Sequence, residues 1–208
     1  DYLNPILKTW VLSRFAIEIN GMPEQYAYFD VETWVESAMR YFTNRNFRVI
    51  GDSGKVYGYG RSVWAMIDTE TRQPQDILAI RDGAINDWIT ADVECPIDKG
   101  SRVKMAHDLP VVRTIDTYYN DVDVNGHINS VKYIEHVLDL FSIEWYKQYD
   151  LRRLEIAYVA ESHGGDRLTF RIQDGTDELE KSISIAKLTE NGSNSVEVCR
   201  CMVKFVKK

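Results

Sequence analysis

The stretch "DVDVNGHINSVKYI", residues 121–134, decides how this chain is interpreted. It places Asp123, Asn125 and His127 at alternating positions, with Gly126 between the last two. Apolar residues then recur at helical spacing, which predicts one amphipathic helix over residues 130–148. The apolar stripe consists of Ile134, Val137, Leu138, Phe141 and Trp145. An acid, an amide and an imidazole are therefore expected on one face, directly before a helix.

Strand-like segments lie on both sides of this motif. They carry β-branched and aromatic residues with partial alternation, which is typical of half-buried strands. We expect strands over 10–19, 26–39, 46–52, 56–68, 111–119, 154–160, 167–174, 180–189 and 194–206. "GDSG" at 51–54 predicts a hairpin turn, because Gly and Asp tolerate positive φ. Asn129 or Ser130 is the expected N-cap of the helix.

An internal repeat organises these strands. Residues 17–33 align with 154–170 at an offset of 137, and 47–67 align with 185–205 at 138. Turn positions and strand lengths agree although identity is low. We therefore expect two similar halves, 1–72 and 111–208, joined by a linker over 73–110. Apolar residues of the linker should pack down: Ile77, Leu78, Ile80, Ile85 and Trp88. The strand and helix that precede the second meander would, in the first half, fall before residue 1, so that half is expected to be truncated at its start and to lack its own long helix.

Composition excludes several classes of protein. The 208 residues are 44% hydrophobic and 27% charged, which argues against disorder. The net charge of −7 argues against general nucleic-acid binding, which needs a positive field. No apolar run approaches the roughly 18 residues that a membrane-spanning helix needs. Cys95, Cys199 and Cys201 show no C-x-x-C spacing, which indicates free thiols in a reducing cytoplasm and no zinc site.

One long helix followed by a strand meander resembles the hot-dog pattern, in which a curved antiparallel sheet wraps a helix. "DVDVNGHINSVKYI" is similar to the signature of the acyl-acyl carrier protein (acyl-ACP) thioesterases, and the "RNFRVIGDSG" segment resembles their N-terminal half. The resemblance covers nearly the whole chain and points to the bacterial type. It implies an α+β tandem hot-dog fold and hydrolysis of fatty acyl-ACP to release free fatty acid in fatty-acid synthesis. The implied partner is acyl carrier protein with its phosphopantetheine-linked acyl chain. No cofactor or metal is implied, and a homodimer stays open.

The resemblance also implies a catalytic set, which here consists of Asp123, Asn125, His127 and Glu161. A thioester can be hydrolysed by an activated water, given a general base and a donor for the oxyanion. His127 can take a proton near neutral pH, Glu161 can hold or deprotonate the water, and Asn125 can donate to the carbonyl oxygen. Asp123 would orient the loop or the imidazole. The N–H of Gly126 and the start of the helix would add to the oxyanion site.

The residues alone leave other interpretations open. Asp123 and Asn125 could form an Asx-turn, His127 could be an ordinary loop histidine and Glu161 a solvated turn residue. His163 is taken as a surface residue. Plant members of the family carry Cys directly after the Glu, whereas this chain has Ser162 there.

Ser162 lacks the G-x-S-x-G context of a nucleophilic serine, so water attack is favoured. On that basis Ser162→Ala is expected to keep most activity.

Alternative functions also stay open. They are an acyl-CoA thioesterase of the same fold, a non-catalytic acyl-binding protein, and a hot-dog hydratase, for which no motif is present. An acidic carrier protein would need local basic residues for docking. Candidates near the motif are Arg102, Lys104, Lys132, Arg152 and Arg153, although each could equally be an ordinary solvated charge.

Overall fold

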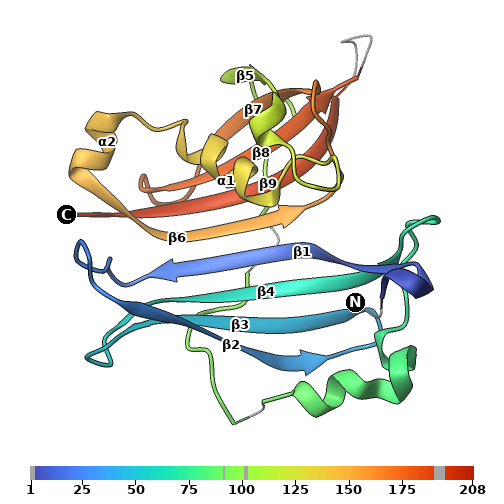
Figure 1. The fold of residues 1–208 in the computed structure, drawn as a ribbon. Coiled ribbons are helices and arrows are strands. Elements are labelled where there is room, and N and C mark those ends of the chain that lie inside the picture. Colours follow the sequence, from blue (N-terminus) through green and yellow to red (C-terminus); the bar gives the residue numbers. More distant parts are fainter. Residues whose placement is uncertain (1–2, 91, 101–102, 190–194) are drawn as a thin grey trace. The chain divides into compact units, whose positions relative to one another are not determined.

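The computed structural model describes residues 3–90, 92–100, 103–189 and 195–208. The chain forms two compact units, residues 1–100 and 101–208. The boundary falls inside the predicted linker, so residues 73–100 belong to the first unit. Each unit is built on an antiparallel meander of strands (Figure 1).

The first unit contains four long strands. They are β1 (Lys8–Ile19), β2 (Phe29–Ala38), β3 (Phe42–Gly51) and β4 (Val56–Asp68), in the sheet order β2-β3-β4-β1. A short 3-10 helix, η1 (Asn4–Ile6), precedes them. A 3-10 segment, η2 (Ile77–Trp88), follows and is interrupted by non-helical residues at 80–83. The predicted turn at 51–54 joins β3 to β4, with Gly54 at φ +78°.

The second unit contains five strands and two short helices. They are β5 (Arg113–Asp116), η3 (Tyr119–Asp121), α1 (Ser130–Leu138), α2 (Ile143–Gln148), β6 (Tyr149–Tyr158), β7 (Arg167–Asp174), β8 (Glu180–Leu188) and β9 (Ser195–Lys207). Their sheet order is β6-β9-β8-β7-β5. The strand predicted over 111–119 is shorter than expected. Its end turns into η3, because the Asp121 carboxylate accepts the Tyr118 N–H at 2.7 Å.

The strands of the two units correspond along the sequence. β2, β3 and β4 start at residues 29, 42 and 56, whereas β7, β8 and β9 start at 167, 180 and 195, so the offsets are 138, 138 and 139. A register shift in β1 between Leu12 and Arg14 recurs in β6 between Leu151 and Arg153. The two meanders also have the same order, β2-β3-β4-β1 and β7-β8-β9-β6. The predicted repeat is therefore present in the strands and in their pairing.

The helix predicted over residues 130–148 is wrong as a single element, because it is interrupted between α1 and α2. Ser142 caps the second helix by accepting the Trp145 N–H at 3.1 Å. The interruption brings the ring of Phe141 against Phe205, with centroids 4.8 Å apart. The apolar stripe is thus retained on the sheet, although the backbone between the two helices turns.

The core of the second unit lies between α1 and the sheet. Alternate residues of β9 point into it, and none exposes more than 1% of its surface: Cys199, Cys201, Val203 and Phe205. Val137 of α1 is fully buried, and Tyr133 is 3% exposed. Each large apolar side chain buried in this way contributes about 1.5–3 kcal/mol. All three cysteines of the chain are free and buried, as predicted for Cys199 and Cys201.

One face of the first sheet is covered by a strap, residues 93–99. Trp34 of β2 packs beneath the strap and donates its indole N–H to the Val93 carbonyl oxygen at 3.0 Å. Arg61 of β4 donates to two strap carbonyl oxygens, at 2.6 and 2.8 Å. The strap is therefore held by a buried cluster and by hydrogen bonds to its backbone. The buried cluster consists of Trp34, Cys95 and Ile97.

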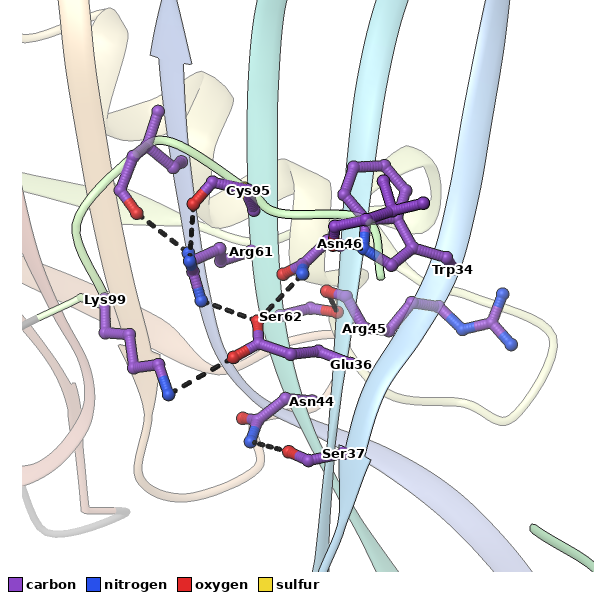
Figure 2. A network of polar contacts seen from close by, with 12 residues as sticks. Trp34, Glu36, Ser37, Asn44, Arg45, Asn46, Arg61, Ser62, Cys95 and Lys99 are labelled. Carbon is purple, nitrogen blue, oxygen red and sulfur yellow. Dashed lines mark hydrogen bonds and ion pairs between the residues drawn. The ribbon is translucent and has the colours of Figure 1, made fainter. Parts of the chain in front are cut away.

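A carboxylate organises the polar contacts under this strap (Figure 2). Glu36 accepts from Arg61 at 2.6 Å and from the Asn46 amide at 2.8 Å, and Lys99 lies 3.3 Å away. Burial opposes ionisation of Glu36, but the Asn46 hydrogen bond and the charges of Arg61 and Lys99 outweigh it. The pKa of Glu36 is therefore below its ordinary value of 4.5.

Glu36→Gln is expected to destabilise the first unit by about 1–3 kcal/mol at pH 7, because it weakens charged hydrogen bonds to Arg61. A lowered pKa contributes stability above pH 4.5 that is lost as the pH falls through the folded-state value. Urea unfolding at several pH values should therefore show a smaller acid dependence in the variant. Glu32→Gln is the control. Glu32 also lies on β2 and pairs with Arg48 of β3, but it is exposed, so its substitution should cost less than about 1 kcal/mol. Equal losses in both variants would contradict the prediction.

The opposite face of the first sheet borders a cavity and an apolar groove. Trp64 and Met66 lie there, 139 residues before Val203 and Phe205, which face the helices of the second unit. Residues 3–68 form no helix longer than η1, as predicted for a half that lacks its long helix. Instead, a cavity of about 640 Å³ lies between this face and η2, and an apolar groove of about 440 Å³ lies farther along it.

The η2 segment closes the cavity only in part. Ile77 is buried and Ile80 and Ile85 line the cavity, as predicted, but Leu78 is exposed and Trp88 is 73% exposed at its edge. The interruption at 80–83 explains the difference, since three of its residues have positive φ and the apolar positions no longer share one helical face.

Candidate active site

The motif forms a tight turn rather than an extended segment. The Asp123 N–H donates to the His127 carbonyl oxygen at 2.8 Å, and the Gly126 N–H donates to the Asp123 carbonyl oxygen at 3.1 Å. Gly126 lies at φ +83°, a conformation that favours glycine. The predicted alternation across 123–127 is therefore wrong, because the turn places Asp123 opposite His127. The N–H of Gly126 is also occupied within the turn, which corrects its predicted use for an oxyanion.

The Asp123 carboxylate holds this turn together. One of its oxygens accepts the backbone N–H groups of Asn125 at 2.8 Å and His127 at 3.1 Å. The other lies 3.5 Å from the side-chain nitrogen of Asn125. This is the Asx-turn that the residues alone left open, and it makes Asp123 an orienting group for the loop. The carboxamide of Asn125 belongs to an exposed residue.

The helix that follows begins at Ser130, three residues after His127. Asn129 is its N-cap and accepts the Val131 N–H at 2.9 Å, as one of the two predicted caps. The Asn129 N–H in turn donates to the carbonyl oxygen of Asp121 at 2.8 Å. Asp121 also contacts the His136 ring nitrogen at 3.1 Å. The start of α1 is thus fastened to η3, so the position of His127 relative to the helix is defined.

A second segment, residues 161–163, lies beside the motif. The Ile128 N–H donates to the Ser162 carbonyl oxygen at 2.8 Å, and His127 and His163 form an antiparallel bridge. In such a pairing, alternate residues point to opposite sides. Glu161 and His163 therefore share the side of His127, whereas Ser162 points to the side of buried Ile128.

This pairing brings the predicted acid and imidazole together. Nε2 of His127 lies 3.5 Å from a carboxylate oxygen of Glu161. Their side chains are 29% and 43% exposed, so water can reach both groups. The separation is longer than a strong direct hydrogen bond, which leaves the pair able to adjust around a bound water or substrate.

Sequence reasoning placed His163 at the surface and missed its neighbour. His163 is exposed, but its ring centroid lies 5.0 Å from that of His127 in an edge-on arrangement. The signal available in the sequence was its spacing of two from Glu161. That spacing becomes informative only once residues 161–163 are known to be extended beside the motif.

The side chain of Ser162 faces away from the reactive groups. It is 1% exposed, and its hydroxyl is hydrogen-bonded to the hydroxyl of Tyr133 on α1. Burial raises the pKa of Tyr133 well above its ordinary value, so its hydroxyl stays protonated and cannot act as a base for Ser162. The geometry thus separates Ser162 from the solvent-accessible face on which Glu161 lies.

The basic residues proposed for docking have differing surroundings. Arg153 is largely buried and donates to Glu155 at 2.8 Å, so it is unsuited to a docking surface. Lys132 pairs with Glu135 at 2.7 Å, and Lys104 is exposed. Arg102 lies outside the described residues.

Within the described ranges, no group of three or more His, Cys, Asp and Glu side chains could hold a metal ion.

Profiles of one family match both units. The N-terminal domain profile of the acyl-ACP thioesterases matches residues 2–80, and the C-terminal domain profile matches residues 105–205. The chain belongs to the acyl-ACP thioesterase family. The C-terminal match includes the motif and residues 161–163, so the site described above lies within the family's C-terminal domain.

Relatives of this chain include plant proteins. A chloroplast acyl-[acyl-carrier-protein] hydrolase of Cuphea viscosissima is 30% identical over 162 residues, which cover 73% of this chain and 38% of that protein. An oleoyl-acyl carrier protein thioesterase of Coriandrum sativum is 27% identical, over 76% of this chain and 45% of that protein. The chain spans about two-fifths of the length of the curated relatives that it matches.

Solved structures confirm the fold. An acyl-ACP thioesterase from Bacteroides thetaiotaomicron is 49% identical with a TM-score of 0.87, covering 98% of this chain and 79% of that one. The 12:0-ACP thioesterase from Umbellularia californica is 18% identical with a TM-score of 0.85, covering 100% and 78%, and shows the fold alone. The predicted α+β hot-dog fold is therefore confirmed.

None of the helices in the described ranges is long and apolar enough to cross a membrane.

Gly126→Ala tests the turn of this family member. A Cβ at Gly126 would meet nothing within 4 Å, so the effect comes from the backbone alone. At φ +83° an alanine costs about 1–2 kcal/mol, and relaxation of the turn would displace His127. We expect unfolding at lower urea and a fall in kcat of roughly tenfold or more.

Gly54→Ala is the matched control for this test. It has φ +78° and an equally open Cβ position in the β3–β4 turn, so it should cost similar stability and leave kcat unchanged. An unchanged kcat in Gly126→Ala would contradict the role of the turn.

Proposed function

We propose that this chain hydrolyses fatty acyl-ACP thioesters to free fatty acid and carrier thiol, by attack of a water that His127 and Glu161 bind together. Family membership supports the substrate class. The observation that carries the proposal is the 3.5 Å approach of His127 Nε2 to the Glu161 carboxylate, in a position open to water.

The proposed reaction needs only groups that this unit supplies. The water oxygen attacks the thioester carbonyl carbon and passes a proton to the His127–Glu161 pair. The carbonyl oxygen gains negative charge, and in this scheme the carboxamide of Asn125, an exposed residue, donates a hydrogen bond to it. When the intermediate collapses, the carbon–sulfur bond breaks and the proton returns to the thiolate of the carrier's phosphopantetheine. Asp123 takes no proton in this scheme and keeps the turn in place.

Water is favoured over Ser162 as the nucleophile. Ser162 is buried, its hydroxyl contacts Tyr133, and alternation directs it away from His127. The two mechanisms differ in their intermediates, because serine attack forms a covalent acyl-enzyme. Rapid-mixing assays should therefore show no burst of released carrier. A burst equal to the enzyme concentration, lost in Ser162→Ala, would make Ser162 the nucleophile.

The proposed function is tested by hydrolysis of matched acyl-ACP and acyl-CoA substrates across a series of chain lengths. We expect turnover of acyl-ACP, with a higher kcat/KM than for the CoA thioester of the same acyl group. Preference for acyl-CoA would favour the acyl-CoA thioesterase alternative. Saturable binding of acyl-ACP without turnover would identify a non-catalytic acyl-binding protein.

Partner, location and assembly complete the proposal. Acyl carrier protein is acidic, so docking would use local basic residues, with Lys104 and Lys132 as candidates on the second unit. Three free, buried cysteines agree with a reducing cytoplasm. A homodimer stays a prediction that light scattering during gel filtration would check.

A further inference from the structure

We infer that Tyr133 is a positioning residue that, through the hydroxyl of Ser162, sets the place of Glu161 opposite His127. Tyr133 lies on α1, which begins three residues after His127, and Ser162 directly follows Glu161. The hydroxyl–hydroxyl contact between them therefore connects the helix that follows the motif to the segment that carries Glu161. The inference rests on the proposed catalytic role of Glu161.

The contact is buried and specific. Tyr133 is 3% exposed and Ser162 is 1% exposed, so both hydroxyls lie away from bulk solvent. Burial raises the pKa of Tyr133 well above its ordinary value, which keeps it a neutral hydrogen-bonding partner near neutral pH. Separation of the two residues would leave a buried hydroxyl without its hydrogen-bonding partner, which is unfavourable.

The backbone of Glu161 and Ser162 is also hydrogen-bonded to neighbouring segments. Its carbonyl oxygen accepts from Lys187 at 2.8 Å, and the next carbonyl, that of Ser162, accepts the Ile128 N–H. One contact ties the backbone to β8, and the other ties it to the motif. The Ser162 hydroxyl ties the same segment to α1 through Tyr133. A displacement of about 1 Å between reacting groups can cost on the order of 10²-fold in rate.

Removing either hydroxyl should therefore act on turnover rather than on substrate binding. We expect Tyr133→Phe to lower kcat by between about tenfold and 100-fold with little change in KM. Ser162→Ala should lose as much kcat as Tyr133→Phe. This revises the expectation from the sequence that Ser162→Ala keeps most activity. The double variant should be no worse than either single one, since both changes remove the same connection.

Tyr146→Phe is the matched control. The Tyr146 hydroxyl donates to the Leu138 carbonyl oxygen at 2.7 Å, at the other end of α1. Its loss removes a half-buried tyrosine hydrogen bond to the same helix without touching residues 161–163, so it should leave kcat unchanged. An equal fall in kcat in Tyr146→Phe would assign the effect to general helix packing and overturn the inference.

A spectroscopic measurement tests the connection without turnover. The chain has four histidines, His107, His127, His136 and His163, so the ring resonances can be assigned by single substitutions. Tyr133→Phe should move the His127 ring resonances in the direction that Glu161→Gln moves them and leave His107 unchanged. If Tyr133→Phe unfolds, the double variant with Ser162→Ala, which leaves no orphan hydroxyl, carries the same expectation.

The two proposals can fail separately. Wild-type kcat and unshifted His127 resonances in Tyr133→Phe would overturn the inference and leave the proposed function standing. A wild-type chain that turns over no acyl-ACP, with His127 still shifted by Tyr133→Phe, would refute the proposed function and support the connection.

Discussion

His127→Ala is expected to lower kcat for acyl-ACP hydrolysis by at least about 10²-fold, the usual scale for a lost general base. The imidazole is the group that faces Glu161 across 3.5 Å, and alanine offers no proton acceptor in its place. KM should change little, because the proposed role of the imidazole is to accept a proton during the reaction. Steady-state kinetics at saturating substrate would measure the effect.

The control for this substitution is His107→Ala. His107 is exposed in the segment before β5, and its backbone carbonyl oxygen accepts the Leu109 N–H. Its removal should leave kcat unchanged. Turnover near wild type in His127→Ala would remove the imidazole from the mechanism and leave Glu161 to act alone.

Local patterns predicted most of the fold. The strands over 56–68 and 167–174 were predicted to the residue, because alternation and the flanking Gly, Asp and Ser turns are local signals. The break between α1 and α2 was not predicted, because it depends on a contact between residues far apart in the sequence. Phe141 and Trp145 continue the apolar stripe in sequence, and the contact of Phe141 with Phe205, 64 residues away, is what selects the interrupted form.

The site was less accessible from sequence. The motif and the resemblance predicted Asp123, Asn125, His127 and Glu161. The turn that places Asp123 opposite His127 was not predicted, because it depends on the left-handed conformation of Gly126. The approach of His163 and the Tyr133–Ser162 contact depend on how residues 161–163 align with the motif. That alignment is set by backbone pairing across more than 30 residues, for which the side-chain pattern carries no signal.

Glu161→Gln is expected to lower kcat by about 10²- to 10⁴-fold. The substitution keeps the size of the side chain and removes only its charge and its ability to accept a proton. The fold should therefore persist, since the carboxylate is 43% exposed and the backbone contacts of Glu161 do not involve it. Glu144→Gln on α2, where an exposed Glu pairs with Lys147, is the control and should leave kcat unchanged.

The combination of Glu161→Gln with His127→Ala distinguishes a working pair from two independent groups. If the two side chains activate one water together, either substitution alone already removes that water's activation, so the double variant should be about as slow as the slower single one. Independent contributions would multiply instead. A multiplied loss would mean that His127 and Glu161 act at separate steps, and the shared water would have to be abandoned even if both residues proved essential.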